Sequence, residues 1–565
     1  MSENNFEKKS DADKVKELCS RWEQLKSERA KFESRWSEAQ KYCDNNELSW
    51  GDINSLPTQP KRNSSSPFNY AKTLIAGIIG YAISPSIPWF KLSLERQDLL
   101  NAYGVKDWLE KCERVLIAAF NRSNFYKESV QAVKDAVIIG HGPLLLDEDI
   151  ENARLRFTKF PANELYFDVN EYGEYDTCYR WYSTTLRNFM QFFGADDDNI
   201  DESYKEAYEK PERWNDRIEL LQCVFPREDF NPDEKDSKNM PFACYYIDNK
   251  HKKIIRESGY HEFPYAVFVW ERLSGYAYGS SPAQDAMPDI KALNLIKKSS
   301  LQIAQSSAEP PMLATEGVNN IDTKPRGVTY LPNATSRLEA LKIGENYPIT
   351  LQELANYEQA IKDWFYVDYF LMLESKQGKM TATEVVELQG EKAATLSTFI
   401  VNLNDFLQTI ITRTFRTLLR NGEFTEVPEA LAGQAANLKI DFIGPLAQSQ
   451  KKYHTMGGTV QALQIVGPIM QMYPNAGDYI NGDELMKTAM EGQGLPQNVI
   501  REDDDVKKIR EERAKEQAAQ AAQQQQMAMA QSLMQNANKL GQTPQDGSLM
   551  QQMNEQLKGG MNGGV

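Results

Sequence analysis

The chain has 565 residues and a formal net charge of −16, so it is long enough for several domains and too acidic overall for a static grip on nucleic acid. Hydrophobic residues make up 41% and aromatic residues 10%, which predicts a folded core. The most apolar window, Thr73–Ile83, is shorter than the roughly 20 residues of a membrane-spanning helix, and the polar N-terminus carries no apolar signal segment, so we expect no membrane partner.

The cysteines show no pattern of a metal site or a redox motif. None forms a C-x-x-C pair, and none lies at zinc-type spacing to a histidine. We therefore expect reduced core residues of a cytosolic protein. The six cysteines are Cys19, Cys43, Cys112, Cys178, Cys223 and Cys244.

The N-terminal region reads as a series of helices. Apolar residues at alternating steps of three and four predict a first helix from Val15 to Ala39, with its stripe broken once, at Arg29. A second helix is predicted over Pro67–Ile83, and the proline-rich phrase Ser84–Phe90 is a rigid exit from it. Two more helices are predicted over Val105–Phe120 and Ser129–Ile139.

From Leu144 the pattern changes to short strands separated by turns and acidic loops. Two turns are predicted, around Glu151-Asn152 and over Asn170–Gly173, and Asp196–Asp198 marks an acidic loop. The predicted strands are Leu144–Asp149, Leu155–Phe160, Leu165–Val169, Tyr175–Tyr182, Ile218–Phe225, Phe242–Ile247 and Tyr265–Trp270.

After Gly279 the chain becomes mostly helical again. Ser281 precedes Pro282 and can cap a helix with proline at its first position. Pro288 either kinks that helix or restarts it. The helix ends at the double proline after Glu309. The next helix is predicted to open with a capping box at Thr350–Glu353 and to run to about Met372.

The segment Glu309–Ile349 between those two helices is rich in proline and glycine and reads as a small loop-and-strand module. A second capping box, Thr381–Glu384, opens a long helix that ends at Asn421-Gly422. A last helix is predicted over residues 502–540. From Gly541 the composition suggests disorder.

No pattern points to catalysis, a cofactor or a metal. The histidines match no ligand motif, and the chain has neither a G-x-x-x-x-G-K-[ST] loop nor a G-x-S-x-G elbow. The acidic cluster Asp147–Glu151 is the strongest metal candidate, but its acids fall at one apparent hairpin tip, which favours a solvated turn over converging ligands. We therefore expect no enzymatic activity.

Several phrases, in the same order and over most of the chain, resemble the head-to-tail connector (portal) proteins of short-tailed bacteriophages. Each phrase alone is weak, and the combination is specific. The phrases are Ser84–Phe90, Ser123–Tyr126, Gly275–Asn294, Met380–Val385 and Phe442–Gln448.

The resemblance implies an α+β fold, predominantly α, assembled as a dodecameric ring. The implied parts are N-terminal helices and a strand-rich wing over 1–280, a first stem helix over 281–308, a clip over 309–349 and a second stem helix over 350–373. They continue with a tunnel loop over 374–381, a long wing helix and following strand over 382–449, a crown over 450–500, a barrel helix over 501–540 and a disordered tail over 541–565.

The same resemblance implies that double-stranded DNA passes through the ring without sequence preference during packaging and ejection. The implied DNA-channel residues are Lys376, Gln377, Gly378 and Lys379. Without the resemblance, the same loop would be interpreted as a simple connection between two helices. The implied partner-binding residues of the clip are Lys324, Arg326 and Tyr330.

The implied partners are other copies of the chain, the terminase large subunit, a tail adaptor or head completion protein, and the capsid and scaffolding proteins. The implied location is one capsid vertex of the virion, after assembly in the cytoplasm of the host bacterium. Two alternatives from other classes remain open: a metal-dependent nuclease or packaging enzyme, and a helical scaffolding or capsid-shell protein.

Overall fold

The computed structural model divides into two units, Met1–Thr459 and Val460–Val565. Among the described residues of the second unit, Asp503–Leu540 form helix α17, as predicted. The structure describes residues 10–100, 102–149, 154–194, 197–231, 236–316, 318, 321–322, 329–331, 333, 335–340, 347–374, 397–431, 438–446, 486 and 503–540.

The first helix, α1 (Asp11–Cys43), confirms the N-terminal prediction and extends it at both ends. The Ser10 side chain caps it by accepting a hydrogen bond from the amide of Asp13. The buried residues of α1 follow the predicted apolar stripe along its whole length. One helix of 33 residues therefore contributes to two separate apolar clusters of the first unit.

The expected break of the stripe at Arg29 is wrong, because this side chain is 1% exposed and lies within the stripe. Its Nη1 donates to the carbonyls of Asn163 and Leu165 at 2.7 and 3.0 Å, and its Nη2 donates to the carbonyl of Trp50 at 3.3 Å. Its Nε pairs with Glu33 at 2.9 Å. The guanidinium is buried because the folded chain supplies acceptors that the sequence does not reveal.

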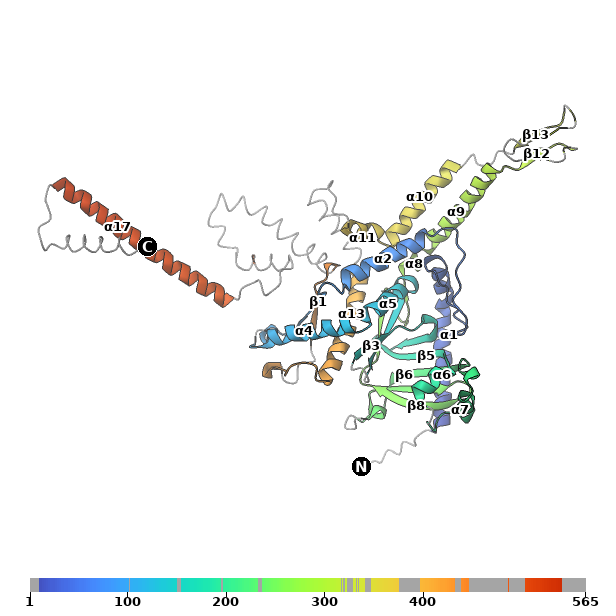
Figure 1. Cartoon of the computed structure of the whole chain (residues 1–565), viewed down its shortest axis with the longest axis horizontal. Coiled ribbons are helices and arrows are strands. Elements are labelled where there is room, and N and C mark those ends of the chain that lie inside the picture. Colours follow the sequence, from blue (N-terminus) through green and yellow to red (C-terminus); the bar gives the residue numbers. More distant parts are fainter. Residues whose placement is uncertain are drawn as a thin grey trace. The chain divides into compact units, whose positions relative to one another are not determined.

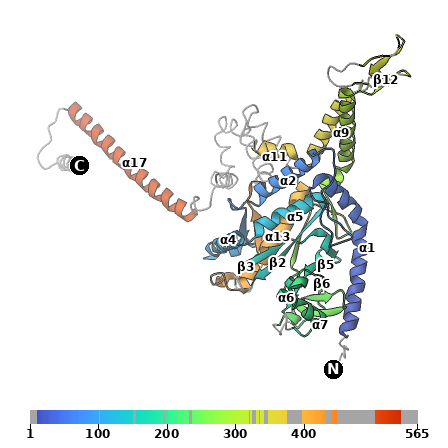
Figure 2. The ribbon, with the colours of Figure 1, turned by 45° about the vertical axis from the view of Figure 1, so that its right-hand side comes forward.

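A five-stranded antiparallel sheet, ordered β4-β5-β6-β7-β8, packs against the N-terminal half of α1 (Figures 1 and 2). Leu221 and Cys223 of β6 face α1, whereas Ile218 and Leu220 face a third apolar cluster on the opposite side. The strands are β4 (Leu165–Val169), β5 (Tyr175–Thr185), β6 (Arg217–Pro226), β7 (Phe242–Asp248) and β8 (Lys253–Tyr260).

The opposite side of this sheet is covered by α6 (Leu186–Phe193) and α7 (Glu202–Tyr208), which form an insertion between β5 and β6. The sequence analysis predicted neither helix and did not predict β8. Both helices are shorter than the windows in which helical periodicity is visible. Strand β8 carries the charged residues Lys253, Arg256 and Glu257, which interrupt its apolar alternation.

A second sheet of three strands, ordered β3-β2-β9, confirms the other predicted strands. These are β2 (His141–Asp149), β3 (Arg154–Thr158) and β9 (Tyr265–Val269). The predicted turn at Glu151-Asn152 lies outside the described residues. His141, at the start of β2, packs between the rings of Trp36 and Tyr278, at 4.7 and 5.0 Å between centroids. Burial lowers the pKa of His141 to about 3, so it is a neutral core residue.

The remaining helices enclose the largest apolar cluster. The predicted helices are present as α2 (Ser66–Ala82), α4 (Val105–Arg122) and α5 (Phe125–Ile139), with a short α3 (Gln97–Leu100) between them. Helix α13 (Ser397–Arg420) packs on β9 and ends before Gly422, whose φ of 72° confirms the predicted left-handed stop. Strand β1 (Phe90–Ser93) pairs with β14 (Lys439–Phe442) beside it.

Five cysteines are buried, Cys19 is half-buried, and all six are free thiols, as the sequence predicted. Burial raises the pKa of the Cys43 and Cys223 thiols, which keeps them protonated and unreactive.

Arg29→Met is expected to lower the free energy of unfolding by roughly 2–4 kcal/mol, because three buried carbonyls lose their donor. The matched control is Arg35→Met on the exposed side of the same helix, which should cost less than about 0.5 kcal/mol. Urea unfolding followed by tryptophan fluorescence measures both. Equal stability of the two variants would contradict the bonding role of Arg29.

Candidate functional site

Two helices, α9 (Met287–Ala308) and α10 (Tyr347–Trp364), pack side by side and leave the body of the first unit together (Figures 1 and 2). We call this pair the strut. Strands β12 (Met312–Ala314) and β13 (Leu338–Ala340) pair at its far end. The strut and its end are the first unit's candidate interaction surface.

The start of the strut is fixed to the core through Ser281. Its hydroxyl accepts from the amide of Gln284 at 3.1 Å, which confirms the predicted cap of α8 (Pro282–Asp285). The same hydroxyl donates to the carbonyl of Ile138, near the end of α5, at 2.8 Å. Of the two alternatives for Pro288, a restart holds: α8 ends at Asp285 and α9 begins at Met287.

The second strut helix differs from the sequence prediction at both ends. Helix α10 begins at Tyr347, so Thr350 lies inside it and the predicted capping box at Thr350–Glu353 is wrong. The helix does not run to Met372. It ends at Trp364, and α11 (Val367–Glu374) follows after Tyr366, whose φ of 52° breaks the helical path.

The inner part of the strut packs on the body. Lys291 of α9 pairs with Glu38 of α1 at 2.7 Å, and Asn294 accepts from the backbone amide of Asn63 at 2.7 Å. On α10, Ile361 and the following Phe365 are fully buried. The root of the strut is therefore a rigid part of the largest apolar cluster.

The outer part of the strut has no such support. Toward the far end of α9, the last buried side chain is that of Ser300. On α10, which returns toward the body, no side chain from Leu351 to Ala360 is buried, and the first buried one is that of Ile361. In this part, Leu301 of α9 is 58% exposed and Leu351 of α10 is 46% exposed. Leu295, further in on α9, is 64% exposed. Exposed leucines on both helices make the strut a candidate surface for contact with other protein. The sequence contained a sign of this exposure, because these leucines lie among polar residues and outside the stripe of buried apolar residues.

The end of the strut carries further exposed apolar side chains. Tyr330, the one described residue of the three predicted for partner binding, is 85% exposed. Leu313 of β12 and Leu331 are also exposed. The other two predicted residues, Lys324 and Arg326, lie outside the described residues. The predicted loop-and-strand module between the helices is present as the β12–β13 pair.

The predicted channel loop, Lys376–Lys379, lies outside the described residues, as do the second capping box at Thr381–Glu384 and nearly all of 450–500. In the described ranges, no group of three or more His, Cys, Asp or Glu side chains could hold a metal ion, and no helix is long and apolar enough to cross a membrane. Asp147 and Asp149 lie in β2, opposite Arg156 and Arg154 of β3.

Comparison with known proteins finds one family and two curated relatives that match most of the chain. The model of the family described as bacteriophage head to tail connecting protein matches residues 15–500. The chain is 31% identical over 536 residues to the portal protein of Salmonella phage epsilon15, covering 92% of this chain and 94% of the relative. It is 27% identical over 528 residues to the probable portal protein of Bordetella phage BPP-1, covering 89% and 92%.

Gly77→Ala is expected to loosen the root of the strut. A Cβ at Gly77 of α2 would lie 2.3 Å from the buried ring of Phe370 in α11, so the change should cost about 1–3 kcal/mol of unfolding free energy. Gly80→Ala, on the same helix and with open space around it, should instead stabilise by up to about 1 kcal/mol. Urea unfolding of the two variants checks the opposite signs, and a loss of the same size in both would overturn the packing argument.

Proposed function

The chain belongs to the bacteriophage head to tail connecting protein family, and from that premise we propose that twelve copies close into a ring at one vertex of a phage capsid. The role is structural: the protein is a portal, or head-tail connector, and a component of the virion. Double-stranded DNA passes through the ring during packaging and again during ejection. The ring assembles in the cytoplasm of the host bacterium.

The observation that carries the ring is the set of exposed leucines along the strut. A single chain leaves Leu295, Leu301 and Leu351 exposed. Contact with a neighbouring copy would bury them, and repeated head-to-tail contacts of one kind close into a ring. Obligate interfaces commonly bury about 2,000–5,000 Å².

In this assignment the strut is the stem: α8 and α9 form its first helix over 281–308, and α10 with α11 forms its second over 350–373. The β12–β13 pair belongs to the clip, 309–349. The wing comprises 1–280 together with the long helix and strand of 382–449. Residues 374–381 form the tunnel loop, 450–500 the crown and 501–540 the barrel helix, with a disordered tail from 541.

The charge of the chain fits passage of DNA rather than tight binding. A net charge of −16 per copy repels a duplex that carries one charge per about 1.7 Å, so the duplex slides. The two lysines of the tunnel loop then supply brief contacts with passing phosphates. Neither comparison favours a nuclease or a scaffolding or shell protein.

Leu295→Glu combined with Leu301→Glu is expected to prevent ring formation while leaving the monomer folded, because the new carboxylates would be buried in the interface. Sedimentation and negative-stain images should show monomers where the natural chain gives rings with an axial hole. The matched control is Leu56→Glu with Ile87→Glu, two exposed apolar residues outside the strut. Rings from the strut variant would remove this assignment.

Lys324→Glu combined with Arg326→Glu is expected to leave rings intact and to weaken docking of the terminase and of the tail adaptor. Exposed loops on rigid supports usually carry binding, and Tyr330 beside them is 85% exposed. Pull-down of each partner by preassembled rings measures the effect. If the double variant fails to form rings, the clip is an assembly element and not a docking surface.

Lys376→Ala combined with Lys379→Ala is expected to spare folding and ring assembly and to reduce packaging efficiency or retention of packaged DNA. Each lysine contributes a weak, salt-sensitive phosphate contact. Nuclease protection of DNA in assembled particles at two salt concentrations measures retention. Particles that package and retain DNA as the natural protein does would exclude the loop from the channel.

A further inference from the structure

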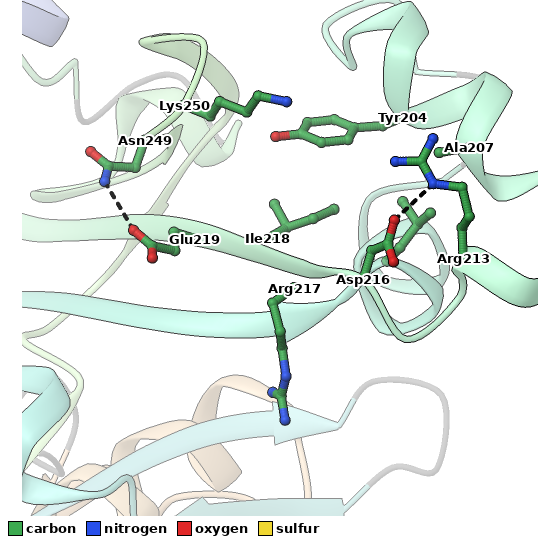
Figure 3. Close-up of a pocket in the computed structure, with 10 residues that line it drawn as sticks. Tyr204, Ala207, Arg213, Asp216, Arg217, Ile218, Glu219, Asn249 and Lys250 are labelled. Atoms are coloured by element: carbon green, nitrogen blue, oxygen red, sulfur yellow. Dashed lines mark hydrogen bonds and ion pairs between the residues drawn. The ribbon is translucent and has the colours of Figure 1, made fainter. Parts of the chain in front are cut away.

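A hollow of about 370 Å³ lies at the insertion between β5 and β6, on the side of the five-stranded sheet opposite α1 (Figure 3). Its floor is apolar and buried, formed by Leu186 of α6, Ala207 of α7 and Ile218 of β6. The ring of Tyr204 forms one wall. The volume is at the lower end of the range of small-ligand sites, about 300–1,000 Å³.

The wall of the hollow is held in place by a buried carboxylate. Asp248, at the end of β7, is 2% exposed and accepts from the hydroxyl of Tyr204 at 3.3 Å and from the amide of Lys250 at 2.9 Å. Its other oxygen lies 2.5 Å from Nδ1 of His251. These bonds join α7 to the β7–β8 turn across the hollow. They fix the Tyr204 ring in its place at the wall of the hollow.

The rim offers positive charge to a ligand. The Lys250 ammonium and the Arg213 guanidinium point toward the same space above Ile218, whereas Arg217 points away (Figure 3). Among the described residues, Lys250 has no ion-pair partner, and only Nε of Arg213 is engaged, with Asp216 at 2.8 Å.

The two carboxylates at the rim both have hydrogen-bond partners, although only that of Asp216 is a cation. Asp216 pairs with Arg213, and Glu219 accepts from the amide groups of Asn249 and Asn54, each at 3.3 Å. The donors still available at the rim are thus one ammonium and two guanidinium nitrogens. They suit a single carboxylate above an apolar floor.

We propose that this hollow docks a peptide segment of another protein, which inserts one apolar side chain against Ile218 and places a carboxylate between Lys250 and Arg213. A nucleic-acid backbone does not fit these features. It has no apolar group to place against the floor formed by Leu186, Ala207 and Ile218. The inference does not depend on the ring, since the insertion of one chain forms the whole site.

Fluorescence anisotropy with the full-length chain tests the docking. The probe is a labelled hexapeptide with one leucine between two glutamates, compared with versions in which serine replaces the leucine or lysines replace the glutamates. The leucine–glutamate peptide should bind saturably, and each other version should bind at least about tenfold more weakly, because each loses one of the two contacts.

Lys250→Ala with Arg213→Ala should weaken the leucine–glutamate peptide by about tenfold or more. The control Lys16→Ala with Arg35→Ala makes the same change of charge on the exposed side of α1 and should not alter binding. The single change Ala207→Leu places a larger side chain in the floor and should by itself abolish binding of the leucine–glutamate peptide.

Four results would each overturn the proposal: no saturable binding of the leucine–glutamate peptide at millimolar concentration, equal binding of the serine peptide, displacement by inorganic phosphate, or displacement by a short DNA duplex. Displacement by phosphate would identify a simple anion site. Displacement by the duplex would identify a nucleic-acid contact instead.

Discussion

The first unit depends on α1 being held in one position against two apolar clusters, and the buried guanidinium of Arg29 holds it there. The N-terminal half of α1 packs on the five-stranded sheet through Val15, Leu18, Trp22 and Leu25. The C-terminal half packs in the largest cluster through Phe32, Trp36, Ala39 and Cys43. Arg29 lies between the two halves and donates to carbonyls before and within β4 and at Trp50.

The hydrogen bonds of Arg29 favour one position of α1 over others. A buried charge is costly unless its donors are satisfied, so alternative positions of α1 that break these bonds are disfavoured. The strut is connected to the same helix, because Lys291 pairs with Glu38. The sheet at one end of α1 and the strut near its other end are thus fixed relative to one another through a single element.

The strut differs from α1, because only part of it is buried. Its root shares the core of the body, whereas its outer half exposes leucines that no part of the described chain covers. Folding of one copy therefore leaves apolar side chains of the strut exposed. The hollow beneath α7 is a different kind of surface, since its walls are complete in one chain.

The periodicity of apolar residues in the sequence was sufficient to predict that the long helices and strands exist. The cap at Ser281 and the stop at Gly422 were predicted from the chemistry of those residues and their neighbours. A helix cap or a helix stop depends only on residues close to it in the chain, so a single sequence is enough to predict it. The short phrases that resemble the connector family were likewise enough to identify the family. Residues that one fold constrains occur in the same order in its members.

Only the tertiary structure decided what Arg29 does, where α10 begins and ends, and where a hollow remains. Two of the three carbonyl acceptors of Arg29, those of Asn163 and Leu165, come from residues more than a hundred positions away. Phe365, directly after the end of α10, is fully buried in the core, and Tyr366 then takes a positive φ, so the helix ends in spite of a helical pattern that continues to Met372. Burial and hydrogen-bond partners arise from contacts distant in sequence, and such contacts leave no periodic signal along the chain.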